Sequence, residues 1–203
     1  MDSLSFFQLS AGVLGALFLI YGMDVRRKAG ARDFVAPVWQ ALMKICAFAL
    51  LGGLAWIVAR MQAPGAIDWL GLAFIAGGTA FVAAAKRALG RSHTFTGQYQ
   101  ERPRLVTHGV YAHTRNPLYL GVFQVELGAL LCALHQVPLL LPENHAMWFG
   151  AFGAALAYAV GFNCAMAVRE VRELERRTGD DYRRYRARVP FLIPRLSPNP
   201  EAR

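Results

Sequence analysis

Charged residues are scarce in this chain of 203 residues, at 17% of the total, whereas hydrophobic residues make up 55%. This balance argues against an ordinary water-soluble domain and indicates a membrane protein. Cysteine is scarce too: the three cysteines lie far apart without a CxxC pair, so no disulfide framework is expected. The histidines do not cluster with carboxylates, and neither GxGxxG nor GxxxxGK[ST] occurs. We therefore expect no metal site and no Rossmann domain.

Long apolar runs are abundant instead. A helix needs about 20 apolar residues to cross a hydrocarbon core of about 30 Å. Five runs approach or exceed this length, so we predict an all-α integral membrane bundle of about five transmembrane helices with a cytoplasmic carboxyl-terminal helix and tail. Pro138 and Pro142 are expected to interrupt the continuation of the fourth run. The runs are Leu4 to Met23, Ala36 to Ala59, Ile67 to Ala85, Leu118 to Leu134 and Ala146 to Val168.

The first run is expected to remain as a helix. Asp2 precedes it, no Lys or Arg comes before it, and no clear small-residue cleavage site follows, which is unlike a signal peptide. We treat residues 1–203 as a single domain, with three spans in residues 1–85 and the chemically rich cytoplasmic segments in residues 86–203. Gly71, Gly77 and Gly78, and also Gly153, Ala157 and Gly161, are expected to permit close helix packing.

Basic residues sort strongly by loop, although the formal net charge of +9 alone would suit nucleic acid. The positive-inside rule then predicts an external amino terminus and a cytoplasmic carboxyl terminus, in an inner membrane of the bacterial type. The basic tail is expected to attract anionic membrane lipid, and no nucleic-acid partner is expected. The basic groups are Arg26, Arg27, Lys28 and Arg32 after the first run, Lys86, Arg87, Arg91, Arg102, Arg104 and Arg115 after the third, and the tail from Arg169.

The stretch LVTHGVYAHTRNPLYLGVF, from Leu105 to Phe123, places polar residues at the start of the fourth run. Asn116 followed by Pro117 predicts a helix start, with Asn as cap and Pro in the first turn. The positive end of this helix would face the cytoplasm, where a carboxylate or phosphate can bind. Arg115 and Tyr119 are four residues apart and can share one side of this entrance. Taken alone, Arg115 suits an interfacial anchor better than a ligand clamp, and Tyr111 and Tyr119 suit an aromatic belt.

The tail REVRELERRTGDDYRRYRARVPFLIP, from Arg169 to Pro194, is expected to continue the fifth helix until Gly179. Glu173 has arginines at four-residue spacing and is explained as a solvated ion pair. Glu170 has no basic residue at that spacing, so it needs a partner from elsewhere. An ion pair with Arg115 and a role in ligand binding are the two alternatives.

Two further charges, Lys44 and Glu126, lie inside predicted spans. A charge within a span is a functional-site hypothesis. The two side chains are candidates to pair with each other. The alternatives are that Lys44 extends toward the membrane surface and that Glu126 bonds to Gln124 or to a helix backbone.

Several short motifs together resemble the isoprenylcysteine carboxyl methyltransferase family and, more widely, phospholipid methyltransferase-like membrane methyltransferases. Their order and spacing match over roughly Leu89 to Pro194. The motifs are LG at Leu89 and Gly90, LVTxGxY from Leu105 to Tyr111, RNPxYxG from Arg115 to Gly121, ExxxL at Glu170 and Leu174, GxxYxxY from Gly179 to Tyr185, and VPxxIP from Val189 to Pro194.

The resemblance implies S-adenosyl-L-methionine as cofactor, bound at the cytoplasmic side, so that residues 86–203 form the cofactor-binding half. Two residues are expected to act in catalysis: Arg115, which would hold an acceptor carboxylate, and Glu170, which would bind the cofactor. Two departures concern the pocket, because the family often has His where Asn116 stands and Glu where Val171 stands. The residues expected to bind the cofactor are Tyr111, Asn116, Pro117, Tyr119, Glu170 and Leu174.

The expected function is methyl transfer to a lipophilic acceptor, such as the carboxylate of a prenylated cysteine, with the acceptor arriving through the membrane lipid. A carboxylate acceptor needs no general base at neutral pH, whereas a phenol, alcohol or amine would need proton removal. Two alternatives remain at this stage: a membrane reductase of the sterol reductase type, and a non-catalytic lipid-binding or transport relative. Binding of the methyl donor distinguishes all three.

Overall fold

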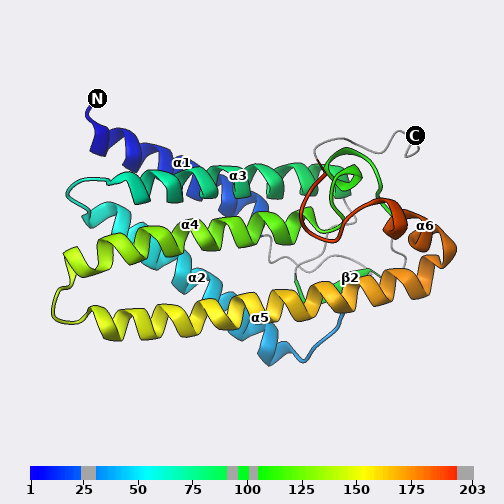
Figure 1. Cartoon of the computed structure of the whole chain (residues 1–203). Coiled ribbons are helices and arrows are strands. Elements are labelled where there is room, and N and C mark those ends of the chain that lie inside the picture. Colours follow the sequence, from blue (N-terminus) through cyan, green and yellow to red (C-terminus); the bar gives the residue numbers. More distant parts are fainter. Residues whose placement is uncertain (24–30, 91–95, 101–104, 196–203) are drawn as a thin grey trace.

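A computed structural model of the chain describes residues 1–23, 31–90, 96–100 and 105–195, and shows a helical bundle (Figure 1). Five long helices are each apolar and long enough to cross a membrane, which confirms the predicted fold class. A short sixth helix, α6, covers Asp180–Arg188 at the end of the bundle where α5 ends. The long helices are α1 Ser3–Gly22, α2 Pro37–Arg60, α3 Ala66–Leu89, α4 Pro117–Leu140 and α5 His145–Thr178.

The outer faces of the long helices are apolar. At most 44% of the apolar window of any span is buried within the bundle, so most of this apolar surface points outward. Large side chains such as Trp39, Ile45 and Leu70 are more than half exposed. In water such a surface would drive aggregation, but in a bilayer it contacts lipid tails. This arrangement fits an integral membrane protein.

Helix α4 extends beyond its predicted end. Pro138 lies inside the helix, so the prediction that it interrupts this span was wrong, whereas the helix does end at Leu140, before Pro142. Proline removes only one helical hydrogen bond here. The last turns are held by Gln136, whose Nε2 donates to the carbonyl oxygen of Ala63 at 3.2 Å and to Oδ2 of Asp68 at 2.7 Å.

Helices α3 and α4 pack closely through glycines. A Cβ atom placed on Gly78 would lie 2.4 Å from the carbonyl oxygen of Gly121, and one placed on Gly128 would lie 2.4 Å from that of Gly71. Gly71 and Gly78 are seven residues apart on α3, as are Gly121 and Gly128 on α4, so the contacts recur after two turns. The prediction of close packing is confirmed for Gly71 and Gly78. It was wrong for Gly153 and Gly161, because a Cβ atom at either position would have no neighbour within 4 Å.

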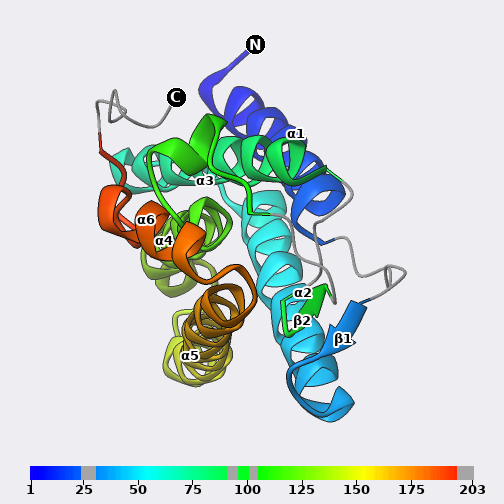
Figure 2. The same ribbon diagram turned by 90° about the vertical axis from the view of Figure 1, so that its right-hand side faces the viewer.

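A two-stranded antiparallel ribbon, β1 Ala31–Asp33 and β2 Gln98–Gln100, lies near the beginning of α2 (Figure 2). The carboxylate of Asp33 accepts hydrogen bonds from Gln40 and Gln98, each at 3.0 Å. The ribbon therefore joins the segment after α1 to the segment after α3. Several of the basic residues used to predict the orientation (Arg26, Arg27, Lys28, Arg91, Arg102 and Arg104) lie outside the described residues.

Candidate functional site

The predicted residue Glu170 lies near the end of α5. This helix has 34 residues and is about 51 Å long, roughly 20 Å more than the hydrocarbon core. Glu170 follows the apolar part of the helix, so it lies where α5 leaves the membrane. The hydroxyl of Tyr119, in the first turn of α4, donates a hydrogen bond of 2.7 Å to Oε1 of Glu170. The structure thus brings together two predicted site residues that are 51 positions apart.

The surroundings of this pair are largely apolar. Tyr119 is 6% exposed and forms a cluster with Met166 and Ala167. In the part of the chain that the structure describes, no Lys or Arg forms an ion pair with Glu170, so the alternative of a Glu170–Arg115 ion pair is not realised. A partly buried carboxylate with one phenol as its partner is incompletely compensated.

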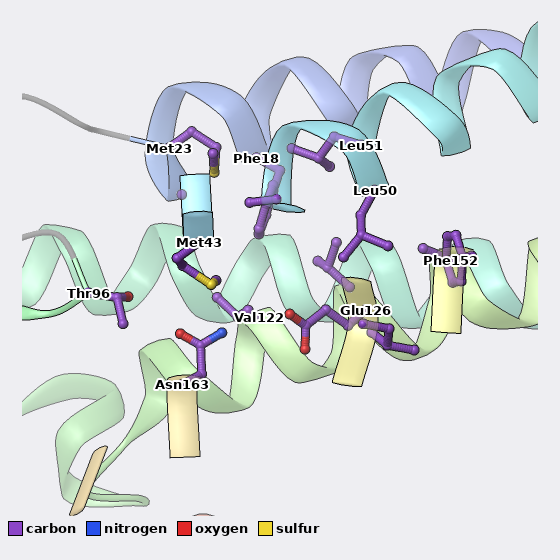
Figure 3. A pocket seen from close by; sticks show the side chains of 15 residues that line it. Phe18, Met23, Met43, Leu50, Leu51, Thr96, Val122, Glu126, Phe152 and Asn163 are labelled. Atoms are coloured by element: carbon purple, nitrogen blue, oxygen red, sulfur yellow. The ribbon is translucent and has the colours of Figure 1, made fainter. Parts of the chain in front are cut away.

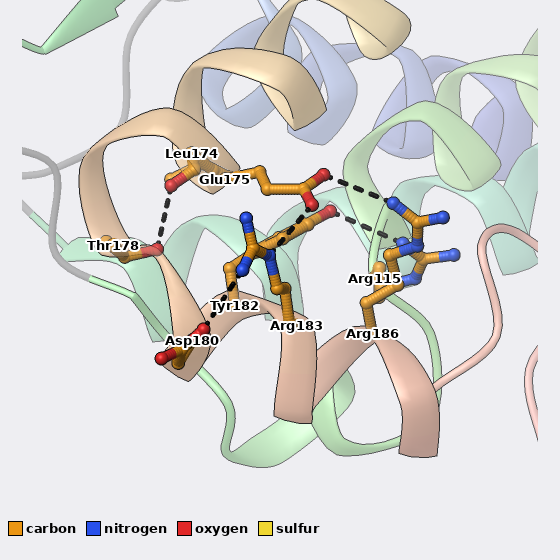
Figure 4. A network of polar contacts seen from close by, with 8 residues as sticks. All are labelled: Arg115, Leu174, Glu175, Thr178, Asp180, Tyr182, Arg183 and Arg186. Atoms are coloured by element: carbon orange, nitrogen blue, oxygen red, sulfur yellow. Dashed lines mark hydrogen bonds and ion pairs between the residues drawn. The ribbon is translucent and has the colours of Figure 1, made fainter.

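Arg115 contacts the carboxyl-terminal tail instead. Its NH1 group donates to the hydroxyl of Tyr182 at 3.4 Å (Figure 4), and its guanidinium lies 5.5 Å from the ring centroid of Phe191. Its backbone N–H donates to the carbonyl oxygen of Pro190 at 2.9 Å. The Nε atom is buried and has no hydrogen-bond partner among the described residues. Arg115 is therefore positioned by the tail, with one donor unused.

The rest of the entrance segment is also fastened to the tail. Thr114, which is fully buried, donates from Oγ1 to the carbonyl oxygen of Leu192 at 2.9 Å. Asn116 stands at the cap position of α4 as predicted, but its side chain makes no cap hydrogen bond. Its Nδ2 donates to the carbonyl oxygen of Phe191 at 2.9 Å. The predicted capping role of Asn116 was therefore wrong, because the tail supplies a carbonyl for this side chain.

Two buried tyrosines complete this junction. Tyr111, in the 3₁₀ helix η2 (Gly109–Ala112), accepts a 2.7 Å hydrogen bond at its backbone carbonyl from the hydroxyl of Tyr185. Burial raises the pKa of Tyr111, and the negative charge of Glu170 raises it further. Burial also raises the pKa of Tyr185. Both phenols therefore remain neutral hydrogen-bond donors at physiological pH.

The other predicted residues lie at the same end of the bundle. Pro117 is fully buried in the first turn of α4. Leu174 packs one turn beyond Glu170 against a cluster that includes Tyr182 and Tyr185. No three His, Cys, Asp or Glu side chains are grouped to hold a metal ion within the described ranges.

Sequence reasoning missed the contributions of Thr114, Tyr182, Tyr185 and Phe191 as site residues. The two tyrosines were visible as the GxxYxxY motif, and their spacing of three puts them on neighbouring positions of one helical face. Thr114 and Phe191 carry no sequence signal, because their contacts join segments more than 70 positions apart.

A pocket lies deeper in the bundle, between α1, α2, α4 and α5 (Figure 3). Its walls are mostly apolar, with Glu126 and Asn163 as polar exceptions. Oε2 of Glu126 is buried without a hydrogen-bond partner among the described residues, so the pair with Lys44 considered from the sequence does not form at that atom. Tyr119 and Glu170 do not line this pocket.

The apolar bundle and its polar junction at one end define an integral membrane protein of the helical class. The family model described as phospholipid methyltransferase matches residues 67–151, from the start of α3 into α5. The resemblance drawn from the motifs is confirmed for this wider family of membrane methyltransferases. The match includes Tyr111, Arg115 and Tyr119 but ends before Glu170. A comparison with curated proteins gives no match.

Proposed function

We propose that this membrane methyltransferase relative uses S-adenosyl-L-methionine to methylate a lipophilic acceptor, such as the carboxylate of a prenylated cysteine. The observation that supports this most is the pairing of Tyr119 with Glu170, where α4 begins and α5 leaves the membrane. Glu170 has no basic partner there among the described residues, and Arg115 keeps an unused donor in the adjoining junction.

The proposed donor has charges that suit this junction. It supplies an activated methyl group on a sulfonium centre, and it also carries an ammonium and a carboxylate. Glu170, oriented by Tyr119, would attract the cationic part. The other residues proposed to hold or shape the donor site are Tyr111, Asn116, Pro117 and Leu174.

The protein's main tasks would be alignment and exclusion of water. Hydrogen bonds from Thr114 and Asn116 hold the tail against the entrance, where the tail would help to exclude water. Arg115 would hold an acceptor carboxylate through its fork of donors. Holding donor and acceptor together in the right orientation lowers the entropic part of the barrier. A carboxylate is already ionised at neutral pH, so it needs no base before it is methylated.

The first test is calorimetric binding of S-adenosyl-L-methionine and S-adenosylhomocysteine to the detergent-purified protein. Glu170→Gln removes the negative charge, so the affinity for S-adenosyl-L-methionine is expected to fall about 10- to 100-fold, as when a charged hydrogen bond is lost. The matched control is Glu173→Gln. Glu173 lies three residues after Glu170 on α5, and its carboxylate pairs with Arg176 and Arg177. Unchanged affinity in Glu170→Gln, or binding of a nicotinamide cofactor instead, would contradict the proposal.

The second test concerns Arg115. With N-acetyl-S-farnesylcysteine as acceptor, Arg115→Ala is expected to raise the KM for the acceptor about 10-fold or more, because a charge-assisted contact is lost. Donor affinity, measured in parallel, should change much less. Arg172→Ala serves as control, because Arg172 is exposed on α5. Normal acceptor kinetics in Arg115→Ala would remove this assignment.

A further inference from the structure

The pocket between α1, α2, α4 and α5 is separate from the Tyr119–Glu170 pair and has a different composition. Its walls come mainly from apolar side chains such as Phe18, Met43 and Leu50. An apolar molecule from the bilayer is chemically suited to such walls.

Two polar atoms break this apolar lining. Asn163 is 1% exposed, and its Nδ2 donor has no hydrogen-bond partner among the described residues. The same holds for the buried Oε2 of Glu126. In Figure 3 both side chains point into the pocket, and the amide nitrogen of Asn163 is on the side toward Glu126. Unmatched polar groups inside a membrane protein are costly, so these two atoms indicate a polar ligand group.

The positions of these residues relate the pocket to the junction. Glu126 follows Tyr119 by seven residues on α4, and Asn163 precedes Glu170 by seven residues on α5. Seven residues are two helical turns, or about 10 Å. Since α4 and α5 run in opposite directions, Glu126 and Asn163 both lie about 10 Å deeper along the helices than the Tyr119–Glu170 pair.

We propose that this pocket binds an apolar molecule carrying a hydroxyl group, and that Asn163 and Glu126 recognise that hydroxyl. A hydroxyl oxygen accepts from Nδ2 of Asn163 while its hydrogen donates to Oε2 of Glu126, so one group satisfies both atoms. An ether accepts but cannot donate, and a hydrocarbon does neither.

The experiment compares two probes of nearly equal shape, farnesol and farnesyl methyl ether, as competitors of radiolabelled farnesol on the purified protein in detergent. Farnesol is expected to bind at least about 10-fold more tightly than the ether, because the ether leaves Glu126 unmatched. Asn163→Leu and Glu126→Leu should each reduce this preference several-fold. Glu126→Gln retains a carbonyl acceptor and should keep most of the preference for farnesol.

The control is Asn144→Leu, at an exposed asparagine outside the pocket, which should leave the preference unchanged. Equal binding of both probes by the unaltered protein would overturn the inference. It would mean that water, and not the ligand hydroxyl, bonds to Nδ2 of Asn163 and Oε2 of Glu126. A preference that persists in both leucine variants would overturn it too, because the hydroxyl would then be recognised elsewhere.

Calorimetry with S-adenosyl-L-methionine separates this inference from the proposed function. A farnesol preference that depends on Asn163, in a protein that binds no methyl donor, would refute only the methyltransferase proposal. Donor binding that depends on Glu170, with no farnesol preference, would refute only the hydroxyl site.

Discussion

At the scale of single residues, the junction depends on neutral phenols and incompletely compensated charges. The hydroxyl of Tyr119 is the hydrogen-bond partner of Glu170, and the hydroxyl of Tyr185 holds the backbone at Tyr111. Buried hydrogen bonds of this kind contribute about 1 kcal/mol each, and more where one partner is charged. Their larger effect is to fix the directions in which Glu170 and Arg115 present their charges.

The raised pKa of Tyr185 predicts a loss of stability at high pH. Between about pH 10 and the folded-state pKa, the Tyr185 hydroxyl has lost its proton in the unfolded chain but keeps it in the folded protein. The free energy of unfolding then falls by about 1.4 kcal/mol per pH unit for this group, whereas below pH 10 the group has no such effect. In thermal unfolding measured from pH 9 to 11.5, the stability of the Tyr185→Phe variant should fall less steeply above about pH 10 than that of the unaltered protein. Parallel profiles for both proteins would contradict this.

At the scale of helices, the contact between α3 and α4 joins two elements that lie within the family match, apart from the first residue of α3. The opposed glycines let the two backbones approach closely, which is how helices associate when lipid is as apolar as their side chains. At the other end of the contact, the buried Asp68 accepts from the backbone N–H of Gly65 at 2.8 Å and from Gln136. The Gly78–Gly121 approach near the start of α4, and the Asp68–Gln136 contact near its end, hold α4 in place relative to α3.

Gly78→Ala tests this contact. The added methyl group would meet the carbonyl oxygen of Gly121 and the side chain of Val125, so the free energy of unfolding should fall by about 1–3 kcal/mol. Gly53→Ala on α2 is the matched control, because its Cβ atom would have no neighbour within 4 Å, and alanine favours a helix more than glycine does. Thermal unfolding in detergent measures both. Equal stability of the two variants would mean that α3 and α4 separate easily.

At the scale of the whole molecule, the polar junction, the ribbon and α6 all lie at one end of the bundle (Figure 1). Contacts such as that from Arg169 to the carbonyl oxygen of Phe34, at 2.9 Å, connect α5 to the segment after β1. A water-soluble donor and a lipid-borne acceptor would meet at this end. The proposed function therefore requires that this end faces the compartment that contains the donor.

The distribution of basic residues predicts that this end is cytoplasmic. Alkaline phosphatase, which is active only outside the cytoplasm, should be inactive when fused after Arg203 and active when fused after Gln62, between α2 and α3. Green fluorescent protein at the same positions should give the opposite pattern. Active phosphatase at the carboxyl terminus would reverse the proposed orientation and place the donor site away from the cytoplasm.

The sequence by itself determined the five spans and the extension of α5 to Gly179, and it predicted Tyr119 and Glu170 as candidate site residues. These features depend on local properties: the length of apolar runs, the turn at Gly179 with its positive φ of 56°, and a carboxylate with no partner on its own helix. Local patterns of this kind are decided within a few turns of chain, so composition and spacing reveal them.

Only the tertiary structure decided which distant groups meet. Asn116 donates to the tail rather than capping α4, Arg115 contacts Tyr182 and Phe191 rather than Glu170, and Asn163 shares a pocket with Glu126. The ribbon likewise pairs Ala31 with Gln100 across 69 positions. The physical reason is that these contacts depend on how the helices rotate and approach one another, which close packing of the whole bundle determines and no single segment encodes.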